Sequence, residues 1–128
     1  MEVIGYRKLI AYQKAKEVVK RTYKLLKKVP AEERWAMCDQ LRRASVSITS
    51  NIAEGINRYS VKDKSHFIEM SYGSLMEVSS QFEIAEDLGY ITKEDRLSMD
   101  QLIEEVARLL SGLQKTYRLS TDSTDSKL

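Results

Sequence analysis

Lysines near the N-terminus are spaced so that they could hold phosphate groups together. On a helix that advances 100° per residue, five of them cluster within about 120° of arc. This lysine stripe consists of Lys16, Lys20, Lys24, Lys27 and Lys28. Such a stripe binds phosphate backbones without reading sequence, although it can also serve only to keep a helix in solution. Arg42 and Arg43 would extend a phosphate-binding surface.

A face of small and polar side chains is the second unusual pattern. Opposite an apolar stripe lie Arg43, Ser47, Ser50, Glu54 and Arg58. Small residues return further along the chain, at Ser71, Gly73 and Ser74. Small side chains let another backbone approach closely, and hydroxyl groups can satisfy the polar groups that such an approach buries. We interpret this face as a subunit or ligand contact, with an ordinary solvated face as the alternative.

Residues that could bind a metal ion or act as a nucleophile are few. His66 is the single histidine, so a di-iron site with its two Glu-x-x-His pairs cannot be built. Cys38 is the single cysteine, and no Cys/His set has zinc spacing. We therefore expect no metal and no cofactor, and we expect His66 on the surface.

Carboxylates three or four residues apart share a helix face, where they could bind magnesium as in all-α nucleotide pyrophosphatases. The candidates are Glu83, Glu86, Asp87, Glu104 and Glu105, although Glu83 and Asp87 also share an outer stripe with Glu69. No phosphate-binding loop accompanies them, and several fit an ordinary outer stripe. A magnesium-dependent nucleotide pyrophosphatase is thus only a third hypothesis, and we expect a protein that is not an enzyme.

Helices must position all of these residues. A single proline and five glycines leave little turn chemistry for a β protein. The expected helices cover about residues 7–28, 31–58, 61–88 and 93–118. Pro30 ends the first, capping patterns at residues 60–63 and 92–95 begin the third and fourth, and Gly89 ends the third.

Each expected helix carries one apolar stripe. The stripes are Ala11, Ala15, Val18, Thr22, Leu25 and Val29; Met37, Leu41, Ala44, Ser45, Ile48 and Ile52; Phe67, Ser71, Leu75, Val78, Phe82 and Ala85; and Met99, Leu102, Val106, Leu109, Leu113 and Tyr117. With short connections they predict an all-α, up-down-up-down antiparallel four-helix bundle over residues 1–119. Tyr12 and Tyr23 flank the first stripe and are expected to pack rather than to stack on bases. Residues 120–128 lack apolar periodicity and are expected to form a disordered tail.

Composition and charge favour one cytoplasmic domain. The chain has 128 residues and a lone cysteine, and it lacks an apolar run long enough for a signal or a membrane span. Residues 1–58 hold 13 Lys or Arg against 6 Asp or Glu, whereas residues 59–128 hold 8 against 13. This asymmetry suggests an anionic partner for the first half, a basic partner for the second, or charge pairing across an oligomer interface.

Two sequence motifs flank the serine cap at residue 60. They are RRASVSITSNIAEG, residues 42–55, and YGSLMEVSSQFEIAEDLGYI, residues 72–91. Together they resemble the 23S rRNA intervening-sequence protein family, also called S23-like four-helix-bundle proteins. The resemblance extends from YRKLIAYQKA, residues 6–15, through the fourth helix. The matching positions include Arg42, Arg43, Ser47, Asn51, Glu54, Gly55, Gly73, Ser74, Leu75 and Glu77.

This resemblance implies a bacterial four-helix bundle that assembles into a ring-like homopentamer, with a poorly defined biochemical role. The chain is more remotely similar to accessory proteins of diversity-generating retroelements, which implies nucleic acid and a reverse transcriptase as partners. No catalytic role is implied for the matching residues. We expect Asn51 and Glu54 to bond a neighbouring helix or subunit, and Gly55 to permit close packing or to end a helix.

The sequence thus leads to one functional hypothesis and one rival. The hypothesis is a non-enzymatic, cytoplasmic homo-oligomer that scaffolds or binds structured RNA or DNA with low specificity, through the lysine stripe, Arg42 and Arg43. The rival is a protein-interaction module that binds no nucleic acid.

Overall fold

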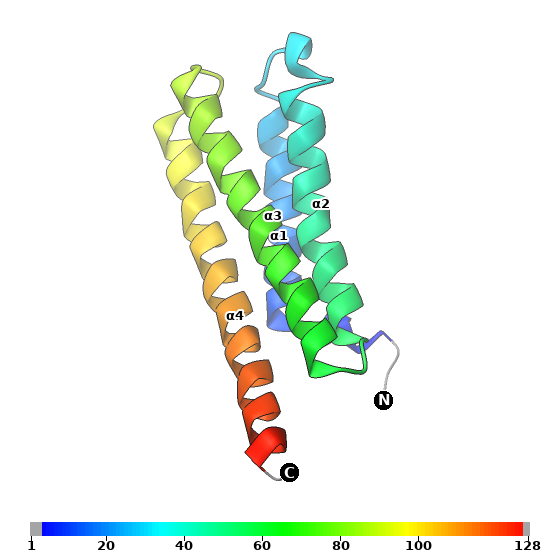
Figure 1. Ribbon diagram of the computed structural model, residues 1–128. Coiled ribbons are helices and arrows are strands. Elements are labelled where there is room, and N and C mark those ends of the chain that lie inside the picture. The colour runs from blue at the N-terminus through cyan, green and yellow to red at the C-terminus, as the bar shows by residue number, and fades with distance from the viewer. Residues whose placement is uncertain (1–3, 127–128) are drawn as a thin grey trace.

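Four long helices pack side by side in the computed structural model, which describes residues 4–126 and their side chains through residue 118 (Figure 1). They are α1 (Ile10–Leu26), α2 (Met37–Ile56), α3 (Val61–Asp87) and α4 (Lys93–Ser126), with short 3-10 helices at Gly5–Lys8 and Ala31–Glu33. No strand occurs within residues 4–126, so the predicted all-α four-helix bundle is confirmed. No helix in this part of the chain is long and apolar enough to span a bilayer.

Neighbouring helices run in opposite directions. Lys14 of α1 contacts Glu105 of α4, whereas Lys28 at the other end of α1 contacts Asp95 at the start of α4. The helices α3 and α4 are antiparallel for the same reason: Ser65 near the start of α3 bonds to Gln114 late in α4, whereas Glu86 at the end of α3 pairs with Arg96 at the start of α4. Contacts between α2 and α3 also join later residues of one helix to earlier residues of the other. This arrangement places α1 beside both α2 and α4, and leaves one long face of each helix outside the core.

The predicted caps of α3 and α4 form. Ser60 Oγ accepts a hydrogen bond from the Asp63 backbone N–H at 3.0 Å, which begins α3. Thr92 and Asp95 make a reciprocal capping box, with side chain-to-backbone bonds of 3.0 and 3.1 Å, which begins α4. Gly89 ends α3 with φ of 79°, the left-handed conformation that favours glycine.

Two helix starts differ from the prediction. Leu9 adopts an extended backbone that divides the expected helix 7–28 into a 3-10 helix and α1, and its half-buried side chain packs on the core. The α2 helix begins at Met37 rather than at residue 31, after the 3-10 helix Ala31–Glu33. Its N-cap, Ala36, makes no side-chain capping bond, so no capping residue in the sequence marked this start.

The end of α4 also differs. The helix continues to Ser126 instead of ending near residue 118, so the expected disordered tail is corrected over residues 120–126. No glycine or proline follows Arg118, and therefore no stop signal interrupts the helix. In Figure 1 the last turns of α4 extend past the neighbouring helices. Residues 127 and 128 lie outside the described part of the chain.

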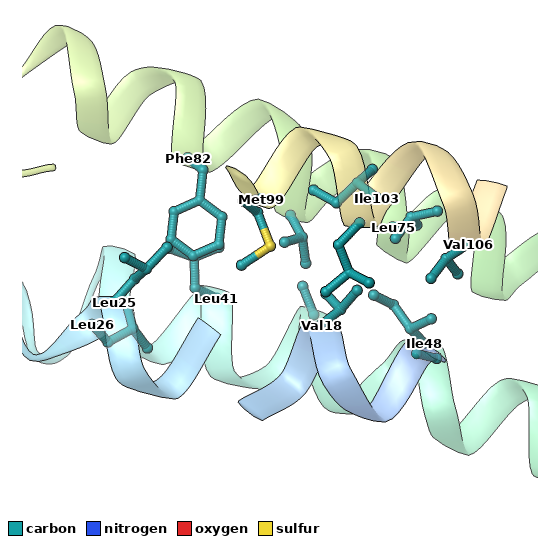
Figure 2. Packing of buried hydrophobic residues seen from close by; sticks show 14 of the residues in the cluster. Val18, Leu25, Leu26, Leu41, Ile48, Leu75, Phe82, Met99, Ile103 and Val106 are labelled. Carbon is teal, nitrogen blue, oxygen red and sulfur yellow. The ribbon is translucent and has the colours of Figure 1, made fainter. Parts of the chain in front are cut away.

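The core fills the centre of the bundle with side chains from all four helices (Figure 2). The largest fully buried side chains are Phe82, Leu41, Ile48, Ile52, Ile68, Leu75, Met99 and Leu110. The predicted stripes line this core, although five of their members are only half-buried: Met37, Phe67, Leu109, Leu113 and Tyr117. Phe67 lies at the edge beneath the guanidinium of Arg58, and its neighbour Ile68 takes the central position instead.

Candidate nucleic-acid interface and helix contacts

The lysine stripe lies exposed along α1 and the turn that follows it. Its last member, Lys28, donates to Asp95 Oδ2 at 2.8 Å, and Lys16 Nζ lies 5.4 Å from the centre of the Tyr12 ring. Lys20, Lys24 and Lys27 form no ion pair with any described side chain. Three ammonium groups on this face therefore remain available to an anionic partner.

A groove borders this face where α1 meets α2. We call it the Tyr23 groove; its volume is about 650 Å³, and it is lined by Tyr23, Asp39, Arg42, Arg43, Val46, Ser47, Ser50 and Asn51. Both predicted arginines thus line one groove, next to the helix that carries the lysines. Arg43 pairs with Asp39 at 3.3 Å, and Arg42 donates to the Arg34 carbonyl at 3.3 Å.

The expectation that both Tyr12 and Tyr23 pack holds for only one of them. Tyr12 packs against the core and makes an edge contact with Tyr6, with ring centroids 4.9 Å apart. Tyr23 is 44% exposed and lines the groove, so the packing prediction is wrong for this residue. Its helical position lies about 110° from the centre of the buried stripe, which turns the ring toward the α1–α2 boundary.

Two residues that line the Tyr23 groove, Ser47 and Asn51, also lie near the boundary of α2 with α3, where small side chains serve a contact within the chain. Ser47 Oγ lies 2.9 Å from Ser74 Oγ of α3, and Asn51 Nδ2 donates to both the carbonyl and the hydroxyl of Ser47. The fully buried Ser71 donates to the Ile48 carbonyl across the same contact at 2.8 Å. These hydroxyl and amide groups let α2 and α3 approach closely without leaving buried polar atoms unpaired.

The two motif glycines have opposite surroundings. A Cβ atom on Gly55 would lie 2.8 Å from Cβ of Phe67, so only glycine fits between the end of α2 and the start of α3. A Cβ on Gly73 would meet no atom within 4 Å, because this residue lies on the exposed face of α3. Glu77 is exposed on the same helix, and Glu54 pairs with Arg58 at 3.6 Å within α2.

Comparison with known families accounts for this arrangement. The profile of the 23S rRNA-intervening sequence proteins matches residues 7–112, which span most of the bundle. The chain belongs to this family. The intervening-sequence family profile includes every motif residue described above and ends before the last turns of α4.

A solved structure agrees with this assignment. The chain is similar to a protein of unknown function from the S23 ribosomal protein family of Bacteroides thetaiotaomicron, with 25% sequence identity and a TM-score of 0.76. The match covers 83% of this chain and 99% of the other. Comparison with curated proteins finds no match. The family and its solved relative thus establish the fold and leave the biochemical role open.

Two of the candidate magnesium-binding carboxylates of this intervening-sequence family member, Glu86 and Glu105, are paired with basic side chains. Glu86 pairs with Arg96, which also binds Asp100 at 2.7 Å, and Glu105 pairs with Lys14 at 3.3 Å. The hydrogen bond that Arg96 donates to the Glu86 carboxylate raises the pKa of Arg96 above its usual value. Within the described residues, no three His, Cys, Asp or Glu side chains come together as a metal site would require.

Cys38 and His66 occupy different environments. Cys38 is buried, and burial raises the pKa of its thiol, which disfavours the nucleophilic thiolate. His66 is exposed on α3, as predicted, beside the ring of Phe67. Trp35, which the sequence placed inside a helix, lies 82% exposed in the turn before α2, and no sequence pattern indicated that position.

Proposed function

We propose that the chain is a non-enzymatic, cytoplasmic homo-oligomer that binds structured RNA or DNA with low sequence specificity. The outer face of α1 supplies the phosphate contacts, and Arg42 and Arg43 of α2 extend them. A pentamer is favoured by the family resemblance. Repetition of the same face around an oligomer multiplies weak contacts into useful affinity.

One observation carries this proposal: the outer face of α1 displays lysines that no carboxylate neutralises. Lys20, Lys24 and Lys27 are exposed without an ion pair among the described residues, whereas Lys14 and Lys28 on the flank toward α4 are paired. Ammonium groups with no intramolecular partner can release counterions from a phosphate backbone. The modest net charge of +2 makes this binding weak and salt-sensitive.

Fluorescence anisotropy of a labelled structured RNA, titrated with the full chain at several salt concentrations, tests the proposal. Four phosphate contacts would weaken the affinity roughly 100-fold between about 50 and 200 mM salt. Replacing Lys16, Lys20, Lys24 and Lys27 with Gln should abolish most of the binding. A matched control replaces Lys62, Lys93, Arg108 and Lys115, exposed on α3 and α4, and removes the same charge. Equal loss in both variants would contradict a role for α1.

The oligomer is supported by the exposed face of α3. An interior helical glycine costs about 1 kcal/mol relative to alanine, and Gly73 has no neighbour within its own chain that needs the space. Met70, Ile84 and Leu88 are exposed on the same side of α3 by helical spacing. A neighbouring subunit that packs on this side would explain both the missing side chain and the exposed apolar ones.

Native mass spectrometry of Gly73→Arg tests this contact. The substitution should lower the oligomer mass without unfolding the subunit, because the new side chain meets open space within the chain. Gly112→Arg is the control, since that glycine of α4 is equally exposed and equally free of neighbours. An unchanged mass for Gly73→Arg would show that this face of α3 is solvated. A purely protein-binding module, which the same apolar side chains favour, would oligomerise normally and bind no RNA at any salt concentration.

A further inference from the structure

The Tyr23 groove combines two phosphate-binding arginines with two features that a flat phosphate-binding face does not need. It is a shallow, open groove with a volume of about 650 Å³. It contains an exposed aromatic ring, and it contains two arginines. A phosphate backbone alone requires only convex positive charge, so the ring and the hollow call for a further explanation.

The charge of the groove favours an anion. Asp39 is its one acidic lining residue, and this carboxylate is engaged by Arg43 at 3.3 Å. The Arg43 side chain is nevertheless 80% exposed, and among the described residues the Arg42 guanidinium bonds only to a backbone carbonyl, so both keep donors for a phosphate. Lys20 and Lys27 lie one helical turn before and after Tyr23, which makes the groove continuous with the lysine stripe.

The Tyr23 ring is available for stacking. Among the described residues it makes no aromatic or cation-π contact, in contrast to Tyr12, which contacts both Tyr6 and Lys16. The Ser50 hydroxyl on the same groove makes no hydrogen bond within the described chain and can serve the polar edge of a base. Ring, hydroxyl and guanidinium groups therefore converge on one hollow.

We infer that the Tyr23 groove binds a single-stranded stretch of nucleic acid, with a base stacked on Tyr23 and flanking phosphates held by Arg42, Arg43 and the lysine stripe. This inference rests on the proposed function and specifies its ligand. The bases of a duplex are already stacked and paired, so a duplex can contact the lysine stripe but cannot offer a base face to Tyr23. Stacking on an aromatic side chain tolerates any base, in keeping with low sequence specificity.

The test compares one fluorescein-labelled RNA oligonucleotide, offered single-stranded and as a duplex with its complement, in anisotropy titrations with the full chain. Single-stranded RNA should bind more tightly. Tyr23→Ala should weaken its binding about 10-fold and leave the duplex affinity nearly unchanged, whereas Tyr23→Phe should retain the single-strand affinity. The matched control is Tyr72→Ala on α3, because this tyrosine has a similar exposure of 37% and lies away from the groove.

A second measurement locates the base directly. Oligonucleotides carrying 5-iodouridine crosslink to aromatic rings that contact the base, and mass spectrometry should find the adduct on Tyr23. Equal affinity for single strand and duplex, together with no effect of Tyr23→Ala, would overturn the inference while leaving the proposed function intact. Loss of RNA binding in the lysine variant alone, with Tyr23→Ala binding normally, would overturn it in the same way. A lower oligomer mass for Tyr23→Ala would identify the groove as a subunit contact and would also overturn the inference.

Discussion

The two flanks of α2 differ in how closely they pack against the neighbouring helix. Toward α3, Ser47 bonds to Ser74 and Gly55 lies against Phe67, so both are in direct contact with the neighbouring helix. Toward α1, the Tyr23 groove stays open; its lining includes Arg42 and Arg43 and shares Ser47 and Asn51 with the α3 flank. One helix thus forms a tight contact on one side and an open surface on the other.

This difference shows what small polar residues do in the bundle. On the α3 flank, hydroxyl groups bond across the contact, so the helices approach without stranding polar atoms. On the α1 flank, Tyr23, Arg42 and Arg43 line the groove, and the Arg43 guanidinium stays accessible. The tight flank therefore stabilises the subunit, and the open flank is the one that can accept a ligand.

Filling the tight flank should have the largest effect. Ser71→Leu places extra volume between α2 and α3 and removes the bond to the Ile48 carbonyl, and should lower the free energy of unfolding by about 3 kcal/mol. Ser50→Leu adds the same volume to the exposed side and should change it by less than about 0.5 kcal/mol. Urea unfolding followed by circular dichroism measures both. Similar decreases in the free energy of unfolding for the two variants would contradict the difference in packing between the flanks.

The glycine pair should give smaller effects of opposite sign. Gly55→Ala forces a Cβ against Phe67 and should lower the free energy of unfolding by about 2 kcal/mol. In the dissociated subunit, Gly73→Ala meets no neighbouring atom and should raise it by about 1 kcal/mol, because alanine loses less backbone entropy in a helix. At concentrations where the proposed oligomer forms, Gly73→Ala should lose this gain, because its Cβ would enter the contact with the neighbouring subunit. The two variants are therefore compared at a low and a high protein concentration, and a gain that does not change with concentration would contradict the subunit contact.

The flank of α1 toward α4 should respond to acid. The hydrogen bond from Lys28, with the one from the Thr92 backbone, lowers the pKa of Asp95. Because the folded pKa lies below the ordinary value of about 4, this carboxylate contributes its full stability above about pH 4 and loses it as the pH falls through the folded pKa. Asp95→Asn should therefore cost about 1 kcal/mol at neutral pH, through the weakened cap and ion pair, and little in strong acid. The measurement is the thermal unfolding midpoint of Asp95→Asn and of the unchanged chain as a function of pH. A difference between the two midpoints that stays constant with pH would show that the ionised Asp95 carboxylate is not its cause.

The fold was largely predictable because its signals are local. Ser60, Gly89 and the pair of Thr92 and Asp95 mark helix ends through bonds within a few residues, and these bonds form. The start of α2 was not predictable, because Ala36 makes no capping bond and residues 31–36 contain ordinary helix formers. The extension of α4 to Ser126 was not predicted, because the absence of apolar periodicity after residue 118 does not by itself end a helix.

The candidate site was predictable only in part. Periodicity placed the lysines on one exposed face, and the structure finds them there. Periodicity cannot say which neighbour a face of small residues contacts. The sequence alone therefore could not show that Ser47 bonds to another helix of the same chain whereas Gly73 faces open space. The exposure of Tyr23 follows from its distance around the helix from the core, but the groove depends on how far apart α1 and α2 lie.

The antiparallel order of the helices also determines how quickly the chain can find its fold. Helices adjacent in sequence are adjacent in space, and the turns between them are short, so most contacts join residues that are close along the chain. Such a topology has a low contact order, and bundles of this kind fold within microseconds to milliseconds. The pairing of α1 with α4, in contrast, brings together the first and the last helix of the chain. We therefore expect this pairing to form last during folding, after the hairpin of α2 and α3.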